Sequence, residues 1–454
     1  MNDRGPDSLE ARSLRAVWHP CTQMQVHEKL PLIALARGEG PWLVETNGHR
    51  LLDGVSSWWV NLFGHANPRI GAAIADQLRT LEHAMLAGCT HAPVVELSER
   101  LAALTGHALG HCFYASDGAS AVEIALKMSH HAWRNAGRAD KREFVCIRGD
   151  YHGESLGALG VTDVAIFRDV YAGLLHAAHV TASPDARQTA AAEGPEAPAL
   201  RAIADVERLF AARAGQIAAL IVEPLVQCAT GMAMHEPVFL RELRALCDRY
   251  GVHLIADEIA VGFGRTGSFF ACEQAGIWPD FLCLSKGISG GYLPLSVVLT
   301  RQDIYDNFYS EDITRAFLHS HSYTGNPLAC RAALATLDIF RDDAVLEGNV
   351  RRAAHLDALL APLARDPRVE HLRRRGMIWA FDVRADALAD AANSAGAAGQ
   401  PFSRRFFSAA RAHGVLLRPI GNTVYLMPPY VLSEADNAHL ARATFAALDA
   451  ALAH

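Results

Sequence analysis

Short runs of apolar residues without polar alternation recur along the chain, and longer segments with helical periodicity separate them. Uninterrupted apolar runs are typical of parallel strands that are covered on both faces. Strands that alternate with helices favour an α/β fold with a mainly parallel central sheet and crossover helices. We expect strands of this sheet at residues 111–115, 143–147, 217–222, 252–256 and 281–284.

The pattern changes after about residue 341, where helical segments alternate with short strand candidates around 377–383 and 424–427. This arrangement predicts a compact α+β unit, and we expect the first fifty-odd residues to complete it. A chain of 454 residues is long enough for one large and one smaller domain. The expected division is a large domain at 56–342 and a small domain formed by 1–55 together with 343–454.

Composition and charge exclude several classes of protein. The formal net charge is -7 and basic residues are scattered, which argues against binding to nucleic acid or to an anionic membrane surface. The nine cysteines form no C-x-x-C pair, so neither a disulfide framework nor a zinc ribbon is indicated. A signal-peptide core and a membrane-spanning apolar stretch are both lacking. We expect a cytoplasmic enzyme with small-molecule partners.

Asp257 and Lys286 each follow an apolar run closely. Open α/β sheets bind ligands beyond the carboxyl ends of their strands, so this acid and this amine should meet in one crevice. Pyridoxal phosphate needs such a pair, because a lysine holds its aldehyde as a Schiff base and a carboxylate keeps its ring nitrogen protonated. The alternative for either residue alone is an ordinary solvated position just past a strand.

Two further features lie at strand ends. The turn Ser116-Asp117-Gly118-Ala119-Ser120 lies between a strand and a helix, where free N–H groups and the helix dipole can hold a phosphate. An ordinary helix cap is the commoner use of such residues, but the position relative to Lys286 favours the phosphate. Tyr151 follows the next strand and can place an aromatic face against a cofactor ring, although packing is the commoner role.

Other sites are weaker. The glycines in Gly262-Phe263-Gly264-Arg265-Thr266-Gly267 have the spacing of a dinucleotide-binding fingerprint, which would indicate a nicotinamide oxidoreductase. That fingerprint belongs after the first strand of a βαβ unit, whereas these glycines come late and the next strand ends in a lysine. A turn-rich loop near the active site explains them better. His319 and His321 lack a third ligand at a sensible spacing, so we expect no metal site.

The motifs around these residues occur together in a known enzyme family. They are Ile255-Ala256-Asp257-Glu258-Ile259 with the 262–267 loop, Leu284-Ser285-Lys286-Gly287 with Gly290-Gly291, and Gly325-Asn326-Pro327-Leu328-Ala329. In this combination the chain resembles the class III (ω-type) aminotransferases, which depend on pyridoxal phosphate and have fold type I. The similarity runs through nearly the whole chain, and the combined motifs are highly specific.

The resemblance implies roles for the residues of the cofactor site. Lys286 would form the Schiff base and move protons, Asp257 would hold the ring nitrogen, and Tyr151 would cover the ring. Gly118 and Ala119 would donate backbone N–H groups to the phosphate.

The resemblance also implies a homodimer with shared active sites. Ser322 would reach a phosphate in the neighbouring subunit, His321 would contact the cofactor, and Ser320 would contact the substrate. A Gly-Pro-Thr version of this loop is familiar in the family, so the hydroxyl of residue 322 is kept while the loop shape differs.

A narrower resemblance concerns the substrates. Trp18-His19-Pro20, the 53–59 and 90–93 segments and the 425–430 segment are similar to those of a family member that aminates 8-amino-7-oxononanoate with S-adenosylmethionine in biotin synthesis. That acceptor has a long apolar chain ending in a carboxylate, which suits a wall of Trp58 and Trp59 with Arg418 at its far end. We expect one of the two tryptophans to pack in the core. Cys21 marks a possible donor-site position where the best-known members have a tyrosine.

Several alternatives stay open. Another class III ω-aminotransferase would use a diamine, ornithine, 4-aminobutyrate or a β-amino acid, and the same acceptor could take its amino group from lysine. The segment after Glu223-Pro224 lacks the second glutamate of glutamate-linked relatives. A catalytically silent binding protein of this fold would have lost Lys286 or Asp257, and both are present.

Overall fold

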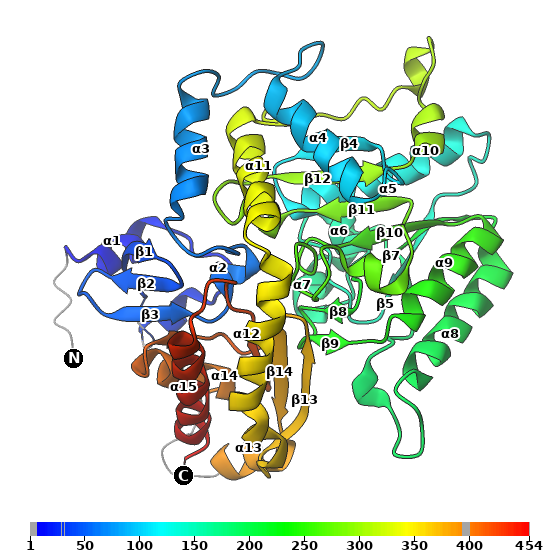
Figure 1. Ribbon diagram of the computed structural model, residues 1–454. Coiled ribbons are helices and arrows are strands. Elements are labelled where there is room, and N and C mark those ends of the chain that lie inside the picture. Colours follow the sequence, from blue (N-terminus) through cyan, green and yellow to red (C-terminus); the bar gives the residue numbers. More distant parts are fainter. Residues whose placement is uncertain (1–6, 29, 31, 393–399, 454) are drawn as a thin grey trace.

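A seven-stranded sheet forms the centre of the protein (Figure 1). The computed structural model describes residues 7–28, 30, 32–392 and 400–453. Six strands run parallel, and β12 runs antiparallel to its neighbours. The five expected strands are all present, which confirms the α/β prediction with its mainly parallel sheet. The spatial order is β4 (His111–Ala115), β12 (Ser296–Thr300), β11 (Phe281–Leu284), β10 (His253–Asp257), β7 (Ile217–Val222), β5 (Glu143–Ile147) and β6 (His179–Thr181).

Helices cover both faces of this sheet. Successive residues of a strand point to opposite faces, and because both sets of side chains are apolar, each face needs a cover. Ile255 packs on the face covered by α5 (Gly118–Asn135), which contributes Val122 and Ile124 to that core. Leu254, one residue earlier, belongs to the core on the other face. That second face is covered by α4 (Ala92–Leu104), α8 (Ala197–Arg213), α9 (Val238–Tyr250) and α11 (Pro327–Asp342).

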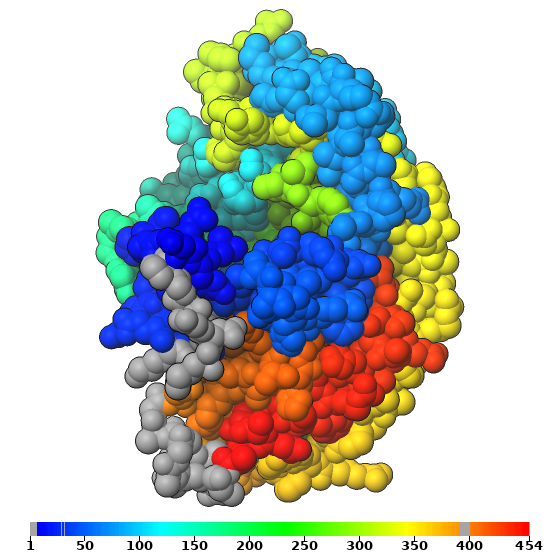
Figure 2. Space-filling model, turned by 90° about the vertical axis from the view of Figure 1, so that its left-hand side faces the viewer, coloured from blue at the N-terminus to red at the C-terminus, as the bar shows by residue number. Residues whose placement is uncertain are grey.

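Two smaller sheets lie beside the large one. The first contains β1 (Leu35–Glu39), β2 (Trp42–Glu45), β3 (Arg50–Asp53) and β15 (Val415–Leu416), and the second contains β13 (Val369–Arg375), β14 (Ile378–Val383) and β16 (Thr423–Leu426). Strand β15 pairs in parallel with β3, so the N-terminal and C-terminal parts of the chain share a sheet. In Figure 2 the blue N-terminal segments lie beside orange and red C-terminal ones. We propose the limits 1–55 and 343–454 for this small domain.

The remaining elements are mostly short. No helix among the described residues combines the length and the apolar character needed to cross a membrane. The other helices are α1 (Leu9–Ala16), α2 (Ser56–Trp59), α3 (Pro68–Leu78), α6 (Leu156–Gly160), α7 (Ala165–Arg168), α10 (Gln302–Asp306), α12 (Val345–Leu360), α13 (Ala385–Ala392), α14 (Phe402–Ala412) and α15 (Glu434–Leu452), and β8 (Val226–Gln227) pairs with β9 (Ala233–Met234).

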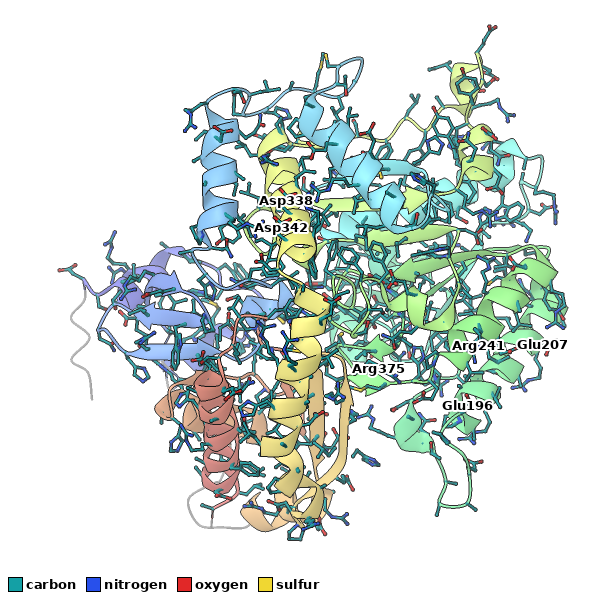
Figure 3. All side chains as sticks on the ribbon, viewed as in Figure 1. Glu196, Glu207, Arg241, Asp338, Asp342 and Arg375 are labelled. Carbon is teal, nitrogen blue, oxygen red and sulfur yellow. The ribbon has the colours of Figure 1, made fainter. Side chains whose placement is uncertain are left out.

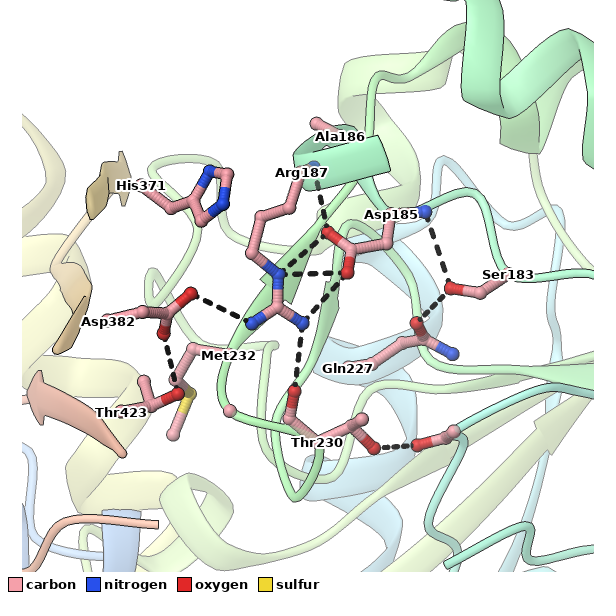
Figure 4. Close-up of polar contacts among 12 residues, drawn as sticks. Ser183, Asp185, Ala186, Arg187, Gln227, Thr230, Met232, His371, Asp382 and Thr423 are labelled. Carbon is pink, nitrogen blue, oxygen red and sulfur yellow. Dashed lines mark hydrogen bonds and ion pairs between the residues drawn. The ribbon is translucent and has the colours of Figure 1, made fainter. Parts of the chain in front are cut away.

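Polar contacts join the large sheet region to the three-stranded sheet (Figure 4). The Arg187 guanidinium lies between two carboxylates, with Nε 2.9 Å from Asp185 Oδ2 and Nη1 3.2 Å from Asp382 Oδ2 on β14. The Thr423 hydroxyl donates a hydrogen bond of 2.6 Å to Asp382. Because these carboxylates are buried, their hydrogen bonds with the arginine fix how the two parts pack.

Ion pairs on α11 connect this helix to its neighbours. Asp338 and Asp342 lie one turn apart on α11 (Figure 3). Asp338 pairs with Arg100 of α4 at 2.9 Å, and Asp342 pairs with Arg69 of α3 at 2.5 Å. Partly exposed pairs contribute little free energy each, so they set the helix register more than the stability.

Candidate active site

The carboxyl ends of the parallel strands meet at one edge of the large sheet. Strands β4, β5, β7, β10 and β11 all run in the same direction, so the residues that follow each strand gather there. Lys286 follows β11, Asp257 ends β10, Tyr151 follows β5 and Gly118 follows β4. The structure therefore brings Lys286, Asp257, Tyr151 and Gly118 to one edge of the sheet.

Lys286 is the first residue of the short 3-10 segment η5 (Lys286–Ser289). Burial lowers the pKa of its ammonium group, although the negative charge of Asp257 and other neighbours opposes this shift. Its Nζ atom lies 5.2 Å from the centre of the Trp59 ring. A lysine whose charged form is disfavoured has more of the neutral amine, which is the form that attacks a carbonyl carbon.

Asp257 is held by a buried histidine. Nδ1 of His152 lies 2.7 Å from Oδ2 of Asp257, and the backbone N–H of Ile259 donates to Oδ1 at 3.1 Å. Burial alone would lower the pKa of His152, but hydrogen bonding and charge attraction from Asp150 and Asp257 raise it to about 10. The ring is therefore a buried cation near neutral pH, and it is hydrogen-bonded to the Asp257 side chain.

His152 is not among the residues predicted from the sequence. Its role depends on Asp150 and on Asp257, which come from different strands. The signal that could have found it is the cluster Asp150-Tyr151-His152 directly after β5, where charged side chains would otherwise be expected to face water.

Tyr151 is tied to a second buried acid. Its backbone N–H donates to Oε2 of Glu223 at 2.9 Å, and its hydroxyl donates to Glu154 at 2.9 Å. Burial raises the pKa of Glu223 to about 8. The Tyr151 ring packs against Phe167 with 5.3 Å between ring centres. These contacts fix the aromatic side chain beside the strand ends.

The turn before α5 offers N–H groups to an anion. The Asp117 side chain accepts the Ser120 N–H at 2.9 Å, which leaves the earlier N–H groups of Gly118 and Ala119 without an intrahelical acceptor. A Cβ atom on Gly153 would lie 2.6 Å from the Ala119 Cβ atom, so glycine is needed where this neighbouring loop meets the turn. Such a helix start suits a phosphate.

Trp58, Arg418 and Cys21 form a group near this edge. The Arg418 guanidinium lies 5.2 Å from the centre of the Trp58 ring, and its Nη2 donates to the Cys21 carbonyl oxygen at 3.3 Å. Trp58 is 46% exposed, whereas Trp59 is buried. The expectation that one tryptophan of the pair packs in the core is therefore correct.

The 319–322 loop contacts a different part of the chain. His319 lies 2.7 Å from Nζ of Lys127 and 3.2 Å from His321, and the side chains of Ser320 and Ser322 are exposed. Within the described ranges, no hydrogen bond or ion pair connects this loop to Lys286 or Asp257. In this chain the loop is connected through His319 to Lys127 of α5.

The glycine-rich loop 262–267 leads into the 3-10 segment η4 (Ala271–Ala275) and then into β11. It therefore lacks the α-helix that follows a dinucleotide fingerprint. Its Arg265 is buried and donates to the backbone oxygens of Pro428 at 2.8 Å and Asn61 at 3.2 Å. The loop is a structural connection near the active site, as expected.

These residues fit pyridoxal phosphate. A lysine with a lowered pKa, a carboxylate held beside a buried imidazolium, an aromatic side chain and a helix start with free N–H groups all lie at the same sheet edge. Among the described residues, no three side chains of histidine, cysteine or acidic type cluster as metal ligands would.

Comparison with known proteins covers nearly the whole chain. The family described as "Aminotransferase class-III" matches residues 23–448. A protein of Helicobacter pylori named adenosylmethionine-8-amino-7-oxononanoate aminotransferase is 43% identical over 437 residues, which cover 95% of each chain. One with the same name in Geobacter sulfurreducens is 38% identical over 446 residues, again 95% of each chain.

Solved structures agree with this match. The aminotransferase of that name from Methanocaldococcus jannaschii superposes with a TM-score of 0.88 at 31% identity, covering 97% of this chain and 98% of the other. A PLP-bound amine transaminase from an uncultivated Pseudomonas species gives 0.87 at 33% identity, covering 95% and 98%. The chain therefore belongs to the class III aminotransferases, enzymes of fold type I that use pyridoxal phosphate.

Proposed function

We propose that this aminotransferase converts 8-amino-7-oxononanoate to 7,8-diaminononanoate in biotin synthesis, with S-adenosylmethionine as amino donor. The names of relatives that are 43% and 38% identical over 95% of the chain support this reaction. The observation that carries the proposal is the pairing of Arg418 with the exposed ring of Trp58.

Arg418 and Trp58 suit an acceptor with an apolar chain and a terminal carboxylate. The guanidinium is exposed, and within the described part of the chain no acidic side chain forms an ion pair with it. A guanidinium binds a carboxylate with two hydrogen bonds, while the indole face contacts the methylene groups. We assign Arg418 to the acceptor carboxylate and Trp58 to its chain.

When bound, pyridoxal phosphate supplies an aldehyde that accepts amino groups and a ring that withdraws electrons from the neighbouring carbon. We assign Lys286 to hold the cofactor and to take and return protons at Nζ, because burial makes the neutral amine available. We assign Asp257, with His152 behind it, to hold the proton on the ring nitrogen. Tyr151 would lie against the ring, and the N–H groups of Gly118 and Ala119 would bind the phosphate.

The 320–322 loop supports a homodimer in which each subunit completes the active site of the other. Ser320 and Ser322 are exposed, so their side chains are accessible to a second copy of the chain. We assign Ser322 and His321 to the cofactor of the partner subunit, and Ser320 to its substrate. We also propose that the enzyme acts in the cytoplasm, because all nine cysteines are free thiols.

The reaction is tested by following the visible absorption of the bound cofactor. S-adenosylmethionine alone should convert it to the amino form, and 8-amino-7-oxononanoate should restore the original spectrum. If lysine instead of S-adenosylmethionine converts the cofactor and 8-amino-7-oxononanoate then restores the spectrum, only the assigned donor changes. Cys21 would then be the first residue to test for a role in donor choice. Failure of 8-amino-7-oxononanoate to restore the spectrum would overturn the proposal.

A second candidate function rests on the amine transaminase that is 33% identical. A simple amine, a diamine or a β-amino acid would then serve as donor, with a different carbonyl compound as acceptor. Conversion of the cofactor by such amines at a higher kcat/KM than by S-adenosylmethionine would favour this function.

A further inference from the structure

Four consecutive residues between β3 and α3 adopt a left-handed backbone. The φ angles of Ser56, Ser57, Trp58 and Trp59 are 50°, 46°, 69° and 74°, and none of these residues is glycine. Side chains other than glycine disfavour this conformation, because Cβ approaches the following carbonyl oxygen. A full turn of such residues persists only where surrounding contacts hold it, and such strain is concentrated at functional sites.

Asp53 holds the start of this left-handed turn. Its Oδ1 accepts the Ser57 N–H at 2.9 Å and its Oδ2 accepts the Ser57 hydroxyl at 2.7 Å. The Val55 N–H also lies 3.4 Å from Oδ1, and His65 Nε2 lies 3.1 Å from Oδ2. The Asp53 side chain is fully buried, so its carboxylate depends on these partners for hydrogen bonds.

Contacts from two other parts of the chain hold the first and the last residue of the turn, Ser56 and Trp59. The Ser56 hydroxyl donates to the Met427 carbonyl oxygen at 2.7 Å, and the Trp59 indole N–H donates to the Tyr425 hydroxyl at 3.2 Å. Nη2 of the buried Arg265 donates to the Trp59 carbonyl oxygen at 3.3 Å. The turn is therefore anchored to the small domain and to the 262–267 loop.

The turn presents its two aromatic rings to two different functional groups. The Trp59 ring lies 5.2 Å from Lys286 Nζ, and the Trp58 ring lies 5.2 Å from the centre of the Arg418 guanidinium. In an extended segment these neighbouring side chains would point in opposite directions. The left-handed turn allows one of two consecutive residues to reach the amine and the other to reach the guanidinium.

We propose that Asp53 is a positioning residue that acts through Ser57. It holds the left-handed turn, and the turn places the tryptophans against Lys286 and Arg418. The separation between the reacting amine and the carboxylate-binding guanidinium is thereby fixed, which selects acceptors by chain length. This inference rests on the proposed roles of Lys286 and Arg418.

The first test compares variants of Asp53 with a control in the same sheet. Asp53→Ala removes both acceptors, whereas Asp53→Asn keeps an oxygen that can accept the Ser57 N–H. The control is Glu45→Gln on β2, because Glu45 is also buried and paired, at 2.8 Å with Arg411, but contacts no residue of the turn. All three variants are compared with the wild type in thermal stability and in steady-state kinetics.

The second test changes the turn itself. Ser57→Gly and Ser57→Val both remove the hydroxyl, but glycine adopts positive φ without steric cost and a β-branched residue does so rarely. This pair keeps the inference testable if Asp53→Ala does not fold. Exposure of Trp58 is measured by acrylamide quenching of tryptophan fluorescence. Each variant is compared with the same variant carrying Trp58→Phe, and the difference in quenching is the contribution of Trp58.

We expect Asp53→Ala and Ser57→Val to raise the KM for the acceptor and to lower kcat by roughly tenfold to a hundredfold, as misplaced groups do. Both should also change the quenching of Trp58. Asp53→Asn and Ser57→Gly should each retain most of the wild-type activity. Glu45→Gln should lower the thermal stability without changing the kinetics.

The inference is overturned if Glu45→Gln reproduces the kinetic pattern of Asp53→Ala, or if the valine and glycine variants of Ser57 behave alike. Fluorescence quenching needs no substrate. A wild-type enzyme that fails to aminate 8-amino-7-oxononanoate would therefore overturn the proposed function, while the quenching results would still decide the role of Asp53.

Discussion

Replacing His152 with glutamine removes a buried positive charge beside Asp257 while keeping a side chain that can donate a hydrogen bond. His152 Nδ1 lies 2.7 Å from Asp257, and Nε2 lies 3.5 Å from Asp150. The second distance is at the outer limit for a hydrogen bond, and both hydrogen bonding and charge attraction from Asp150 raise the pKa of His152. Glutamine cannot supply that charge, and both carboxylates would stay buried without it.

The size of the effect follows from the pKa of His152. A rise from 6.5 to about 10 corresponds to about 5 kcal/mol in favour of the charged ring. Removing one partner of a buried ion pair typically destabilises a protein by about 3–5 kcal/mol. We therefore expect His152→Gln to lower the free energy of unfolding at pH 7 by an amount in this range.

His235 provides a matched control, because it is also buried but neutral. Burial lowers its pKa to about 4, and its ring nitrogens lie 3.3 Å from the carbonyl oxygens of Glu236 and Glu223. His235→Gln should cost about 1–3 kcal/mol, the range for a buried hydrogen-bonding group that loses its partner. The two variants thus separate the loss of a charge from the loss of a buried ring.

The two histidines also contribute to stability in opposite pH ranges. The folded-state pKa of His152 is raised, so its contribution is fully present below pH 6.5 and is lost as the pH rises towards 10. The folded-state pKa of His235 is lowered, so its contribution is present above pH 6.5 and is lost as the pH falls towards 4.

Nitrogen NMR of histidine-labelled protein measures both charge states directly, and the two glutamine variants assign the signals. His152 should remain protonated at pH 8, and His235 should remain neutral at pH 5.5. Chemical denaturation of each variant gives the free energies. A His152 signal that titrates near pH 6.5, or equal destabilisation by the two variants, would refute the reasoning.

Three further variants test the assigned roles. Lys286→Ala should prevent covalent attachment of the cofactor, which borohydride reduction and mass spectrometry would detect in the wild type. The same variant should slow turnover by about 10²-fold to 10⁴-fold, and retained turnover would rule out the role of Lys286. Asp257→Asn should keep bound cofactor, seen by absorbance, yet slow both half-reactions by about 10²-fold or more, and near-normal rates would contradict its role. Arg418→Ala should raise the acceptor KM about tenfold to a hundredfold, since a charged hydrogen bond contributes roughly 1.5–3 kcal/mol, and a change confined to donor kinetics would show that Arg418 is misassigned.

The central sheet could be predicted because its strands are buried on both faces and leave unbroken apolar runs. Strand β12 (Ser296–Thr300) was not among the expected strands, and its antiparallel direction could not be predicted because periodicity carries no information about direction. Strand β1 (Leu35–Glu39) escaped prediction for a different reason, since it is largely exposed and its apolar pattern is weak, while β2 and β3 are buried but only four residues long.

The residues at strand ends were also predictable, because Asp257 and Lys286 break apolar runs with charge. The side chains that hold Asp257 and Lys286 in place could not be predicted from the sequence. His152 acquires its charge from Asp150, which follows the same strand, and from Asp257, which ends β10, and only the folded sheet brings Asp257 to it. The left-handed turn at Ser56–Trp59 contains no glycine, so nothing in the local sequence indicates its backbone. The function of Ser322 depends on a second copy of the chain and stays a prediction.

The active site divides its tasks between two parts of the protein. Asp257 ends β10 and Lys286 follows β11 of the large sheet, which is packed on both faces. Arg418 and Cys21 lie on segments around the smaller sheets, and the turn that carries Trp58 follows β3. Binding residues on connections at a rigid edge can change without disturbing the chemistry. A substitution at Cys21 should therefore alter the choice of donor while leaving the pKa of Lys286 unchanged, which is how one catalytic arrangement can serve aminotransferases with different substrates.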